Sequence, residues 1–296
     1  MQRRTFIKNS TLTVMSISAF GALNWNGKYF EGDNATTTDI LGPFYRPGAP
    51  LRTNLRLPGS NGTPVVLKGI IFNENGKSPI NNAFVEIWHC DEHEVYDNAS
   101  DDYNYRGAQK TKSDGKYEFK TILPVPYKAD PKDEASWRPA HIHMRVSVHN
   151  QQDLVTQLYF KDGTYVDTDK WSSSPQAVNR ILNITRNESG ESEIVFNVTM
   201  SKEIPLDKKV YEKLTGLYQM EGDTIIEFTK NDDLLFMKQN GHLRASLKYT
   251  GNNTFIGGIG YPKATFELQK DGNVKVVVER TADKTYTGTK FLKYSE

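Results

Sequence analysis

The sequence predicts an all-β protein, an antiparallel β-sandwich followed by a small up-and-down β-meander or barrel-like domain. Three observations lead to this fold class. Segments that alternate with period 2 dominate the chain, and no stretch between them keeps a 3.6-residue period. The last third holds short strand-like segments about ten residues apart, joined by Asn-Gly, Asp-Gly and Gly-Asn-Asn turns. Strands of this kind, closed by tight turns, are typical of sandwiches and barrels.

The composition fits a soluble globular protein with one large domain or two modest ones. Charged residues make up 25% of the 296 positions and hydrophobic residues 37%, which is enough for a packed core. Lys and Arg number 37 against 36 Asp and Glu, so we expect no nucleic-acid partner and no anionic membrane. A single Cys excludes an internal disulfide and any cysteine-rich zinc or iron–sulfur site.

Residues 1–25 predict an export signal. The basic start Gln2-Arg3-Arg4-Thr5-Phe6-Ile7-Lys8 resembles a twin-arginine signal, and a weakly apolar run from Ser10 to Leu23 follows it. This run of 14 residues is shorter than the roughly 20 needed to span a bilayer. We therefore expect a periplasmic or extracellular protein without a membrane span. A disordered basic tail is the alternative.

Residues 26–200 are expected to form the sandwich. Each predicted strand is rich in β-branched or aromatic residues and is bounded by Gly, Asn, Asp or Pro. A short helix is expected over Pro175–Leu182. The predicted strands are Val65–Phe72, Phe84–Asp91, Lys116–Leu123, Ala140–Val148, Asp153–Phe160 and Glu191–Met200.

Residues 201–208 read as a charged linker in which Pro205 ends the preceding strand pattern. Residues 209–296 follow as a small all-β accessory domain, whose role the sequence leaves open. Its predicted strands are Thr224–Thr229, Asp233–Met237, Leu243–Tyr249, Thr254–Gly258, Ala264–Leu268, Val274–Glu279 and Tyr286–Phe291.

The segment Ala140–Val148 carries the strongest chemical signal. Read with period 2, one face bears His141, His143 and Arg145, while the other face is apolar. Residues i and i+2 of a strand are roughly 6.5–7 Å apart, so two imidazoles at this spacing can converge on one metal ion. Two histidines that are only hydrogen-bonded or exposed remain the alternative.

Tyrosines are the side chains that stand out as further ligands. Tyr96 and Tyr127 each follow a predicted strand, where loops on a rigid scaffold often carry function. A phenol has a pKa near 10, so a strong Lewis acid is needed to ionise it at neutral pH, and Fe(III) fits that requirement. Zinc usually prefers His, Cys and carboxylate. The cluster His89, Cys90 and His93 is a weaker second candidate, and packing explains Cys90 better.

From about Thr38 to Met200 the sequence resembles the intradiol ring-cleavage dioxygenases, the protocatechuate and catechol dioxygenase group. Five motifs carry the resemblance, in the family's order along the chain. They are Leu41-Gly-Pro-Phe-Tyr45, Asn82-Ala-Phe-Val-Glu-Ile-Trp88 with Tyr96, Ser113 to Pro124 with Tyr127, Arg138-Pro-Ala-His-Ile-His143, and Thr156-Gln-Leu-Tyr-Phe160.

The resemblance implies a β-sandwich that holds one non-haem Fe(III). Tyr96 and His143 would be its equatorial ligands, and Tyr127 and His141 its axial ligands. Two further positions match catalytic residues of the family: Arg138 resembles the arginine that steadies an anionic catecholate, and Gln157 resembles the glutamine beside the ligands.

Two departures from the family pattern lie beside ligands. Glu94-Val95-Tyr96 replaces the usual Gly-x-Tyr, and Val125-Pro126-Tyr127 replaces the usual Gly-Pro-Tyr. Neither change removes a donor, but both are expected at the mouth of the pocket, so they leave the substituents of the substrate ring open.

The implied activity is cleavage of a catechol-type ring between its two hydroxyl-bearing carbons with O2, giving a muconate-type diacid. A small aromatic diol and O2 would be the partners, and Tyr127 would leave the metal to accept a substrate proton. Two alternatives remain open: a non-catalytic, metal-containing β-sandwich binding module of the cell envelope, and a zinc hydrolase that uses the two histidines. A homo-oligomer is neither predicted nor excluded.

Overall fold

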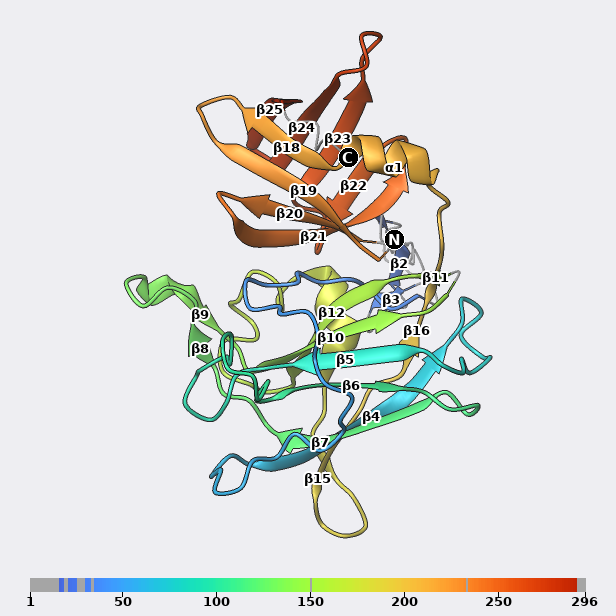
Figure 1. Cartoon of the computed structure of the whole chain (residues 1–296). Helices are drawn as coiled ribbons and strands as arrows, with labels where there is room; N and C mark the ends of the chain where they lie inside the picture. Colours follow the sequence, from blue (N-terminus) through green and yellow to red (C-terminus); the bar gives the residue numbers. More distant parts are fainter. Residues whose placement is uncertain are drawn as a thin grey trace, which may run out of the picture.

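The computed structural model describes residues 35–149, 151–232 and 234–291, together with the backbone of three short N-terminal strands. These strands are β1 (Ser16–Ser18), β2 (Gly21–Trp25) and β3 (Phe30–Gly32). The predicted export signal, residues 1–25, lies outside the described residues apart from the backbone of β1 and β2. In the described part, a sandwich and a barrel are stacked on each other, with the barrel uppermost in Figure 1. The predicted all-β fold class is confirmed. No helix among these residues has the length and apolar character to cross a membrane.

The sandwich consists of two five-stranded sheets. One sheet has the order β13-β12-β10-β5-β6; in the other, β14-β15-β4-β16 lie in order and β7 pairs with β4. The strands of the first sheet are β5 (Phe84–Trp88), β6 (Arg106–Lys110), β10 (His141–Ser147), β12 (Leu154–Phe160) and β13 (Ile181–Leu182). Those of the second sheet are β4 (Pro64–Phe72), β7 (Lys116–Ile122), β14 (Thr185–Arg186), β15 (Ser192–Val195) and β16 (Val198–Thr199).

The core of the sandwich is built by the alternation read from the sequence. Ile142, Met144 and Val146 of β10 are completely buried against the apolar residues of the second sheet, such as Leu67 and Phe119. Because side chains alternate across a strand, His141, His143 and Arg145 must then point away from this core. The metal candidates therefore lie on the outer face of the first sheet.

Some strand pairings differ from the antiparallel expectation. The predicted strand Glu191–Met200 is divided into β15 and β16, and both run parallel to β4. Strand β6 was not predicted, because its sequence Arg-Gly-Ala-Gln-Lys lacks β-branched residues. Gly107 in this strand allows a close approach, since a Cβ there would lie 2.5 Å from Leu55.

Short elements complete the sandwich. The predicted helix at residue 175 is a 3-10 helix, η2 (Pro175–Arg180), and it ends where β13 begins. A second 3-10 turn is η1 (Glu134–Ser136). Two-residue strands form two further pairs: β8 (Tyr127–Lys128) with β9 (Trp137–Arg138), and β11 (Gln151–Gln152) with β17 (Ser201–Lys202).

The second unit is a closed barrel of eight antiparallel strands, as the evenly spaced hairpins predicted. A helix that was not predicted, α1 (Lys208–Leu214), precedes it, and Asp207 caps this helix by accepting a hydrogen bond from the amide of Lys209. The barrel strands are β18 (Gly216–Met220), β19 (Ile225–Asn231), β20 (Leu234–Gln239), β21 (His242–Gly251), β22 (Thr254–Gly257), β23 (Lys263–Leu268), β24 (Val274–Thr281) and β25 (Lys284–Lys290).

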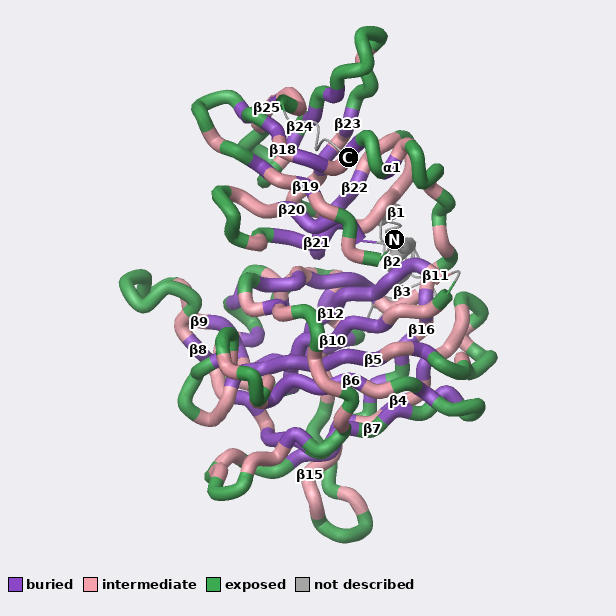
Figure 2. The backbone as a smooth tube through the Cα atoms, in the orientation of Figure 1, coloured by how far each residue is buried: buried purple, intermediate pink, exposed green. Residues whose placement is uncertain are grey.

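Strand β20 packs on both of its faces, which docks the barrel on the sandwich. Leu235 and Met237 belong to the barrel core, whereas Leu234 and Phe236 join an apolar cluster on the outer face of the first sheet. The ring of Phe236 meets that of Tyr45 edge-on at 5.8 Å. Figure 2 shows the result as a buried layer between β20 and β21 above and β12 and β10 below.

One histidine of the weaker candidate cluster has a structural role. The ring of His89 bridges the two sheets, with Nδ1 2.7 Å from the carbonyl oxygen of Cys90 and Nε2 2.7 Å from the hydroxyl of Thr121 on β7. Both nitrogens are therefore occupied by protein groups, and the Cys90 thiol donates to the carbonyl of Val125. This arrangement matches the packing interpretation of Cys90 and disfavours a second metal site here.

Replacing Phe236 with Ala should loosen the barrel from the sandwich. Loss of a buried aromatic ring typically lowers the free energy of unfolding by about 3 kcal/mol. We expect this loss in urea denaturation, together with faster proteolysis of the connection around residues 203–207. Val277→Ala, at an outward and 37% exposed position of β24, is the control. Equal behaviour of the two variants would contradict the docking role of Phe236.

Acid should destabilise the fold partly through His89. Burial lowers the pKa of this imidazole to about 4. Between pH 6.5 and 4 the unfolded chain binds a proton that the folded chain excludes, so stability falls as pH falls through this window, by about 1.4 kcal/mol per pH unit at most. His89→Asn should flatten this part of a plot of unfolding free energy against pH. His242→Asn, at the exposed first residue of β21, is the control. An unchanged slope in His89→Asn would refute the assignment.

Candidate metal centre and active site

Two imidazoles of β10 lie beside each other on the outer face of the sheet. The Nε2 atoms of His141 and His143 are 3.2 Å apart, and both residues are 1% exposed. The backbone carbonyl of Pro139 lies 2.6 Å from Nδ1 of His141 and accepts a hydrogen bond from its N–H, which leaves the Nε2 lone pair of this ring directed into the site. The ring of His143 stacks on Trp88 of the neighbouring strand at 4.8 Å, and this contact fixes its plane.

Two phenols reach the same point from separate segments. Tyr96 lies in the loop after β5, and its hydroxyl is 3.4 Å from Nε2 of His141. Tyr127 is in β8, which β9 holds in place, and its ring centre lies 5.4 Å from that of Tyr96 and 5.5 Å from that of His141. The structure thus brings together all four residues that the resemblance assigns as ligands.

The loop that carries Tyr96 explains one departure from the family pattern. Glu94 has φ of +68°, a left-handed conformation that glycine adopts without strain. A glycine at this position therefore suits the turn, and Glu94 takes the same backbone path. The carboxylate of Asp91 stabilises the turn by accepting hydrogen bonds from the amides of His93 and Val95, each at 2.8 Å.

A glycine also allows the segment before β4 to pass over the site. Gly42 has φ of +75°, and a Cβ at this position would lie 2.9 Å from Cε1 of His143. The next residues extend the cover, since Phe44 stacks on the ring of Tyr96 at 4.4 Å. Tyr45 packs edge-on against Trp88, and its hydroxyl accepts a hydrogen bond from Arg145. This segment therefore closes one side of the site, and its close passage requires glycine at position 42.

Burial keeps all four side chains uncharged in the protein alone. Desolvation lowers the pKa of His141 and of His143 well below the ordinary value for histidine. The same cause raises the pKa of Tyr96 well above 10, and it also raises that of Tyr127. A bound cation reverses this preference for the two phenols, because it stabilises phenolate oxygens and releases the phenol protons, whereas it binds the imidazoles in their neutral form.

The donor set fits a hard, highly charged metal ion. Two donors that share one ion, each about 2.1 Å from it, lie about 3.0–3.4 Å apart. The 3.2 Å between the two Nε2 atoms and the 3.4 Å from Tyr96 to His141 fall within this range. Among the described residues no three His, Cys, Asp or Glu side chains gather into a metal site, so the two phenols are needed to complete the set. This chemistry favours Fe(III) over zinc.

Arg138 lies beside the donors in a fixed position. Its Nε donates to Asp169 at 2.8 Å and its terminal nitrogen donates to Oε1 of Gln157 at 2.8 Å. The face of the guanidinium lies 4.2 Å from the ring of Trp171. Arg138 lines the cavity with Tyr127, whereas Gln157 is completely buried behind it.

The sequence interpretation missed Asp169 and Trp171, and it also missed three residues that lie further along this network. Tyr159 donates to Asp39 at 2.9 Å and to Gln157 at 3.0 Å, and Asp39 is paired with Arg180 at 2.5 Å. All three are almost completely buried. Tyr159 lies in one of the five motifs, but Asp39 and Arg180 are 141 positions apart, and only the fold shows that they pair.

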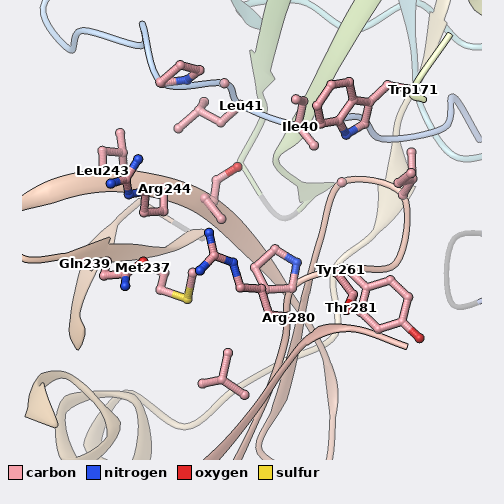
Figure 3. Close-up of a pocket in the computed structure, with 18 of the residues that line it drawn as sticks. Ile40, Leu41, Trp171, Met237, Gln239, Leu243, Arg244, Tyr261, Arg280 and Thr281 are labelled. Carbon is pink, nitrogen blue, oxygen red and sulfur yellow. The ribbon is translucent and has the colours of Figure 1, made fainter. Parts of the chain in front are cut away.

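A cavity of ≈ 660 Å³ opens next to the four donors. Tyr127 and Arg138 line it on the sandwich side, and the opposite wall comes from the barrel. In Figure 3, Ile40, Leu41 and Trp171 lie on one side of this space, and Met237, Arg244 and Arg280 lie on the other. The candidate metal centre is thus accessible to a small molecule through a space that both units enclose.

Comparisons with known proteins find catechol and chlorocatechol 1,2-dioxygenases among the relatives. Chlorocatechol 1,2-dioxygenase of Rhodococcus opacus is 35% identical over 181 residues, which are 54% of this chain and 66% of that protein. Catechol 1,2-dioxygenase 2 of Acinetobacter lwoffii is 32% identical over 150 residues, which are 45% of this chain and 54% of that protein. The chain thus spans between about half and two thirds of the length of these curated relatives.

Solved structures match the sandwich. Catechol 1,2-dioxygenase from Pseudomonas arvilla C-1 superposes with a TM-score of 0.51 at 26% identity, covering 57% of this chain and 63% of that one. The 3-chlorocatechol 1,2-dioxygenase of Rhodococcus opacus 1CP has the same fold, with a TM-score of 0.51 at 24% identity, 58% of this chain and 74% of that one.

The match to a protein family covers more than half of the chain. The sequence model described as dioxygenase matches residues 29–207, which contain the whole sandwich and all four donors but no strand of the barrel. With two tyrosines and two histidines converging inside that region, the chain belongs to the intradiol ring-cleavage dioxygenase family.

Proposed function

We propose that the protein is a non-haem Fe(III)-dependent intradiol dioxygenase. It cleaves a catechol-type ring between the two hydroxyl-bearing carbons with O2 and gives a muconate-type diacid. The observation that carries the proposal is the convergence of Tyr96, Tyr127, His141 and His143 at one point, where Tyr127 also lines the adjoining cavity. Membership in a family with relatives named catechol and chlorocatechol 1,2-dioxygenases supports it.

Bound iron would supply Lewis acidity, drawing electron density from a diphenol and making its ring reactive toward O2. Tyr127 is the ligand that faces the cavity, so it is the donor an incoming diphenol reaches first. Its phenolate oxygen then accepts a proton from a substrate hydroxyl, and burial assists this step because it favours the protonated phenol.

Arg138 binds and orients the substrate anion. Its guanidinium is held by Asp169, Gln157 and the ring of Trp171, so it does not need to reorganise when charge develops in the cavity. Gln157 acts through Arg138 and is a positioning residue: its Oε1 accepts from Arg138 and from Tyr159, while its Nε2 donates to the carbonyl of Ile40.

A non-catalytic metal-containing module of the cell envelope would use the same four donors. An open cavity lined by Tyr127 and Arg138 favours the enzyme, because a metal that served stability alone would need no access for a ligand. Oxygen uptake separates the two functions directly.

The proposal is tested by reconstituting the full chain with ferric iron. We expect about one iron per chain, a visible charge-transfer band from tyrosinate to iron, and oxygen uptake with catechol, hydroxyquinol or protocatechuate. Tyr96→Phe should weaken iron binding at least about tenfold and shift the band. Tyr105→Phe removes another buried phenol, which is hydrogen-bonded to Ser60 and Glu92, and should retain both iron and colour. A colourless protein that stays inert with every diphenol would overturn the proposal.

Tyr127→Phe isolates the acid–base step. Without the phenol oxygen, proton uptake on anaerobic mixing with catechol should weaken, and kcat should fall about a hundredfold. Stopped-flow mixing with a pH indicator measures the first quantity, and an oxygen electrode measures the second. Tyr105→Phe again serves as control. Turnover of Tyr127→Phe at the wild-type rate would show that the proposed role is wrong.

A further inference from the structure

The cavity beside the metal centre is much larger than a catechol ring. Its ≈ 660 Å³ falls in the range of pockets that hold drug-sized ligands, and one six-membered ring with two hydroxyls fills only a part of it. The sandwich supplies the wall around Tyr127 and Arg138. The rest of the space therefore lies against the barrel, which the family match does not include.

The open end of the barrel provides an apolar wall. Met220, Ile226, Met237 and Val278 come from four different strands, belong to the barrel core, and also line the cavity. The opposite end of the barrel is closed by α1, where the hydroxyl of Tyr218 donates to the carbonyl of Leu214. The apolar residues of these four strands thus face the cavity, and an apolar group that enters there is removed from water.

Positive charge accompanies this apolar wall. Arg138, Lys170, Arg244 and Arg280 line the cavity, and Asp283 is the only acidic side chain among the described residues that do so. Arg138 is paired with Asp169. Within the described part of the chain, the side chains of Arg244 and Arg280 have neither an ion pair nor a hydrogen bond. In Figure 3 both extend from the barrel side of the space. An anionic group would complement these two cations.

We propose that the barrel is part of the substrate site and binds the side chain of an ortho-diphenol whose apolar chain of a few carbons ends in a carboxylate. The diphenol end reaches the four donors, the carbon chain lies against the open end of the barrel, and the carboxylate lies at Arg280 and Arg244. This inference rests on the proposed function, and it deepens that function by naming the class of ring substituent.

Three diphenols test the substituent on the iron-loaded full chain: catechol, 4-propylcatechol and 3-(3,4-dihydroxyphenyl)propanoate. Burial of one CH2 group corresponds to about a fourfold change, so kcat/KM should rise at least about tenfold from catechol to 4-propylcatechol. The carboxylate should add about fivefold, a modest value because the two arginines are partly in water. Equal kcat/KM for all three would overturn the inference.

Arg280→Gln tests the anion site with a matched control. It should remove the roughly fivefold preference for the propanoate over 4-propylcatechol, and Arg244→Gln should reduce this preference. Lys275→Gln removes a cation from the outward face of the same strand, β24, outside the cavity, and should leave the preference unchanged. An unchanged preference in both arginine variants, or an equal loss in Lys275→Gln, would refute the assignment.

Calorimetry on the iron-free full chain separates this inference from the proposed function. The chain should bind 3-phenylpropanoate about fivefold more tightly than neutral 3-phenylpropan-1-ol, and Arg280→Gln should abolish this difference. If these results appear while no diphenol is oxidised, the barrel site stands and the proposed function fails. If catechol is oxidised but neither ligand binds and no substrate is preferred, the proposed function stands and the inference fails.

Discussion

The structure depends on one constraint, the burial of both faces of strand β10. Its apolar face fills the sandwich core, and its polar face lies under the residues around Gly42 and under the barrel. A polar group that is removed from water must find a partner inside the protein or in a ligand. For Arg145 the partners are protein groups. His141 contacts the carbonyl of Pro139, the hydroxyl of Tyr96 and Nε2 of His143, and the two Nε2 atoms that face each other can both bind a cation.

Arg145 shows how the same strand connects the two units. Its guanidinium pairs with Asp153 of the sandwich and with Asp232 of the barrel, each at 2.7 Å, and it also donates to Asn231 and Tyr45. Buried ion pairs add little net stability, because the cost of desolvation offsets most of the attraction, whereas an unpaired buried charge is costly. We infer that this cluster selects the docking position of the barrel, while the apolar packing of Phe236 supplies most of the free energy.

Much of the fold could be predicted from local patterns. Alternation identified the strands that have one apolar face, and turn residues identified the barrel hairpins. Strand β6 was not predicted because Gly107 and its neighbours have low β propensity. Helix α1 was not predicted because its seven residues are too few to establish a helical period. Parallel pairing of β15 with β4 also left no local signal, since it depends on how distant segments meet.

The candidate site could be predicted from motif and spacing, but its surroundings could not. Tyr96, Tyr127, His141 and His143 occupy positions that match a family pattern, so their convergence was expected; their roles as ligands stay predictions. The pairing of Asp39 with Arg180 and the contribution of the barrel wall arise from contacts across more than a hundred positions of sequence. Such contacts depend on the tertiary structure and produce no periodic pattern in the sequence.

Two glycines allow close contacts that connect the barrel to His143. Gly258, in a barrel loop, lies so close to Ile40 that a Cβ at position 258 would be 2.7 Å from the side chain of Ile40. Gly42, two residues after Ile40, lies against His143. The stretch from residue 39 to 42 is therefore clamped between the accessory unit and an imidazole. Cutting the chain before α1 would remove the barrel's contact with this stretch. His143 would then keep its stacking on Trp88 but lose one support of the segment that covers it.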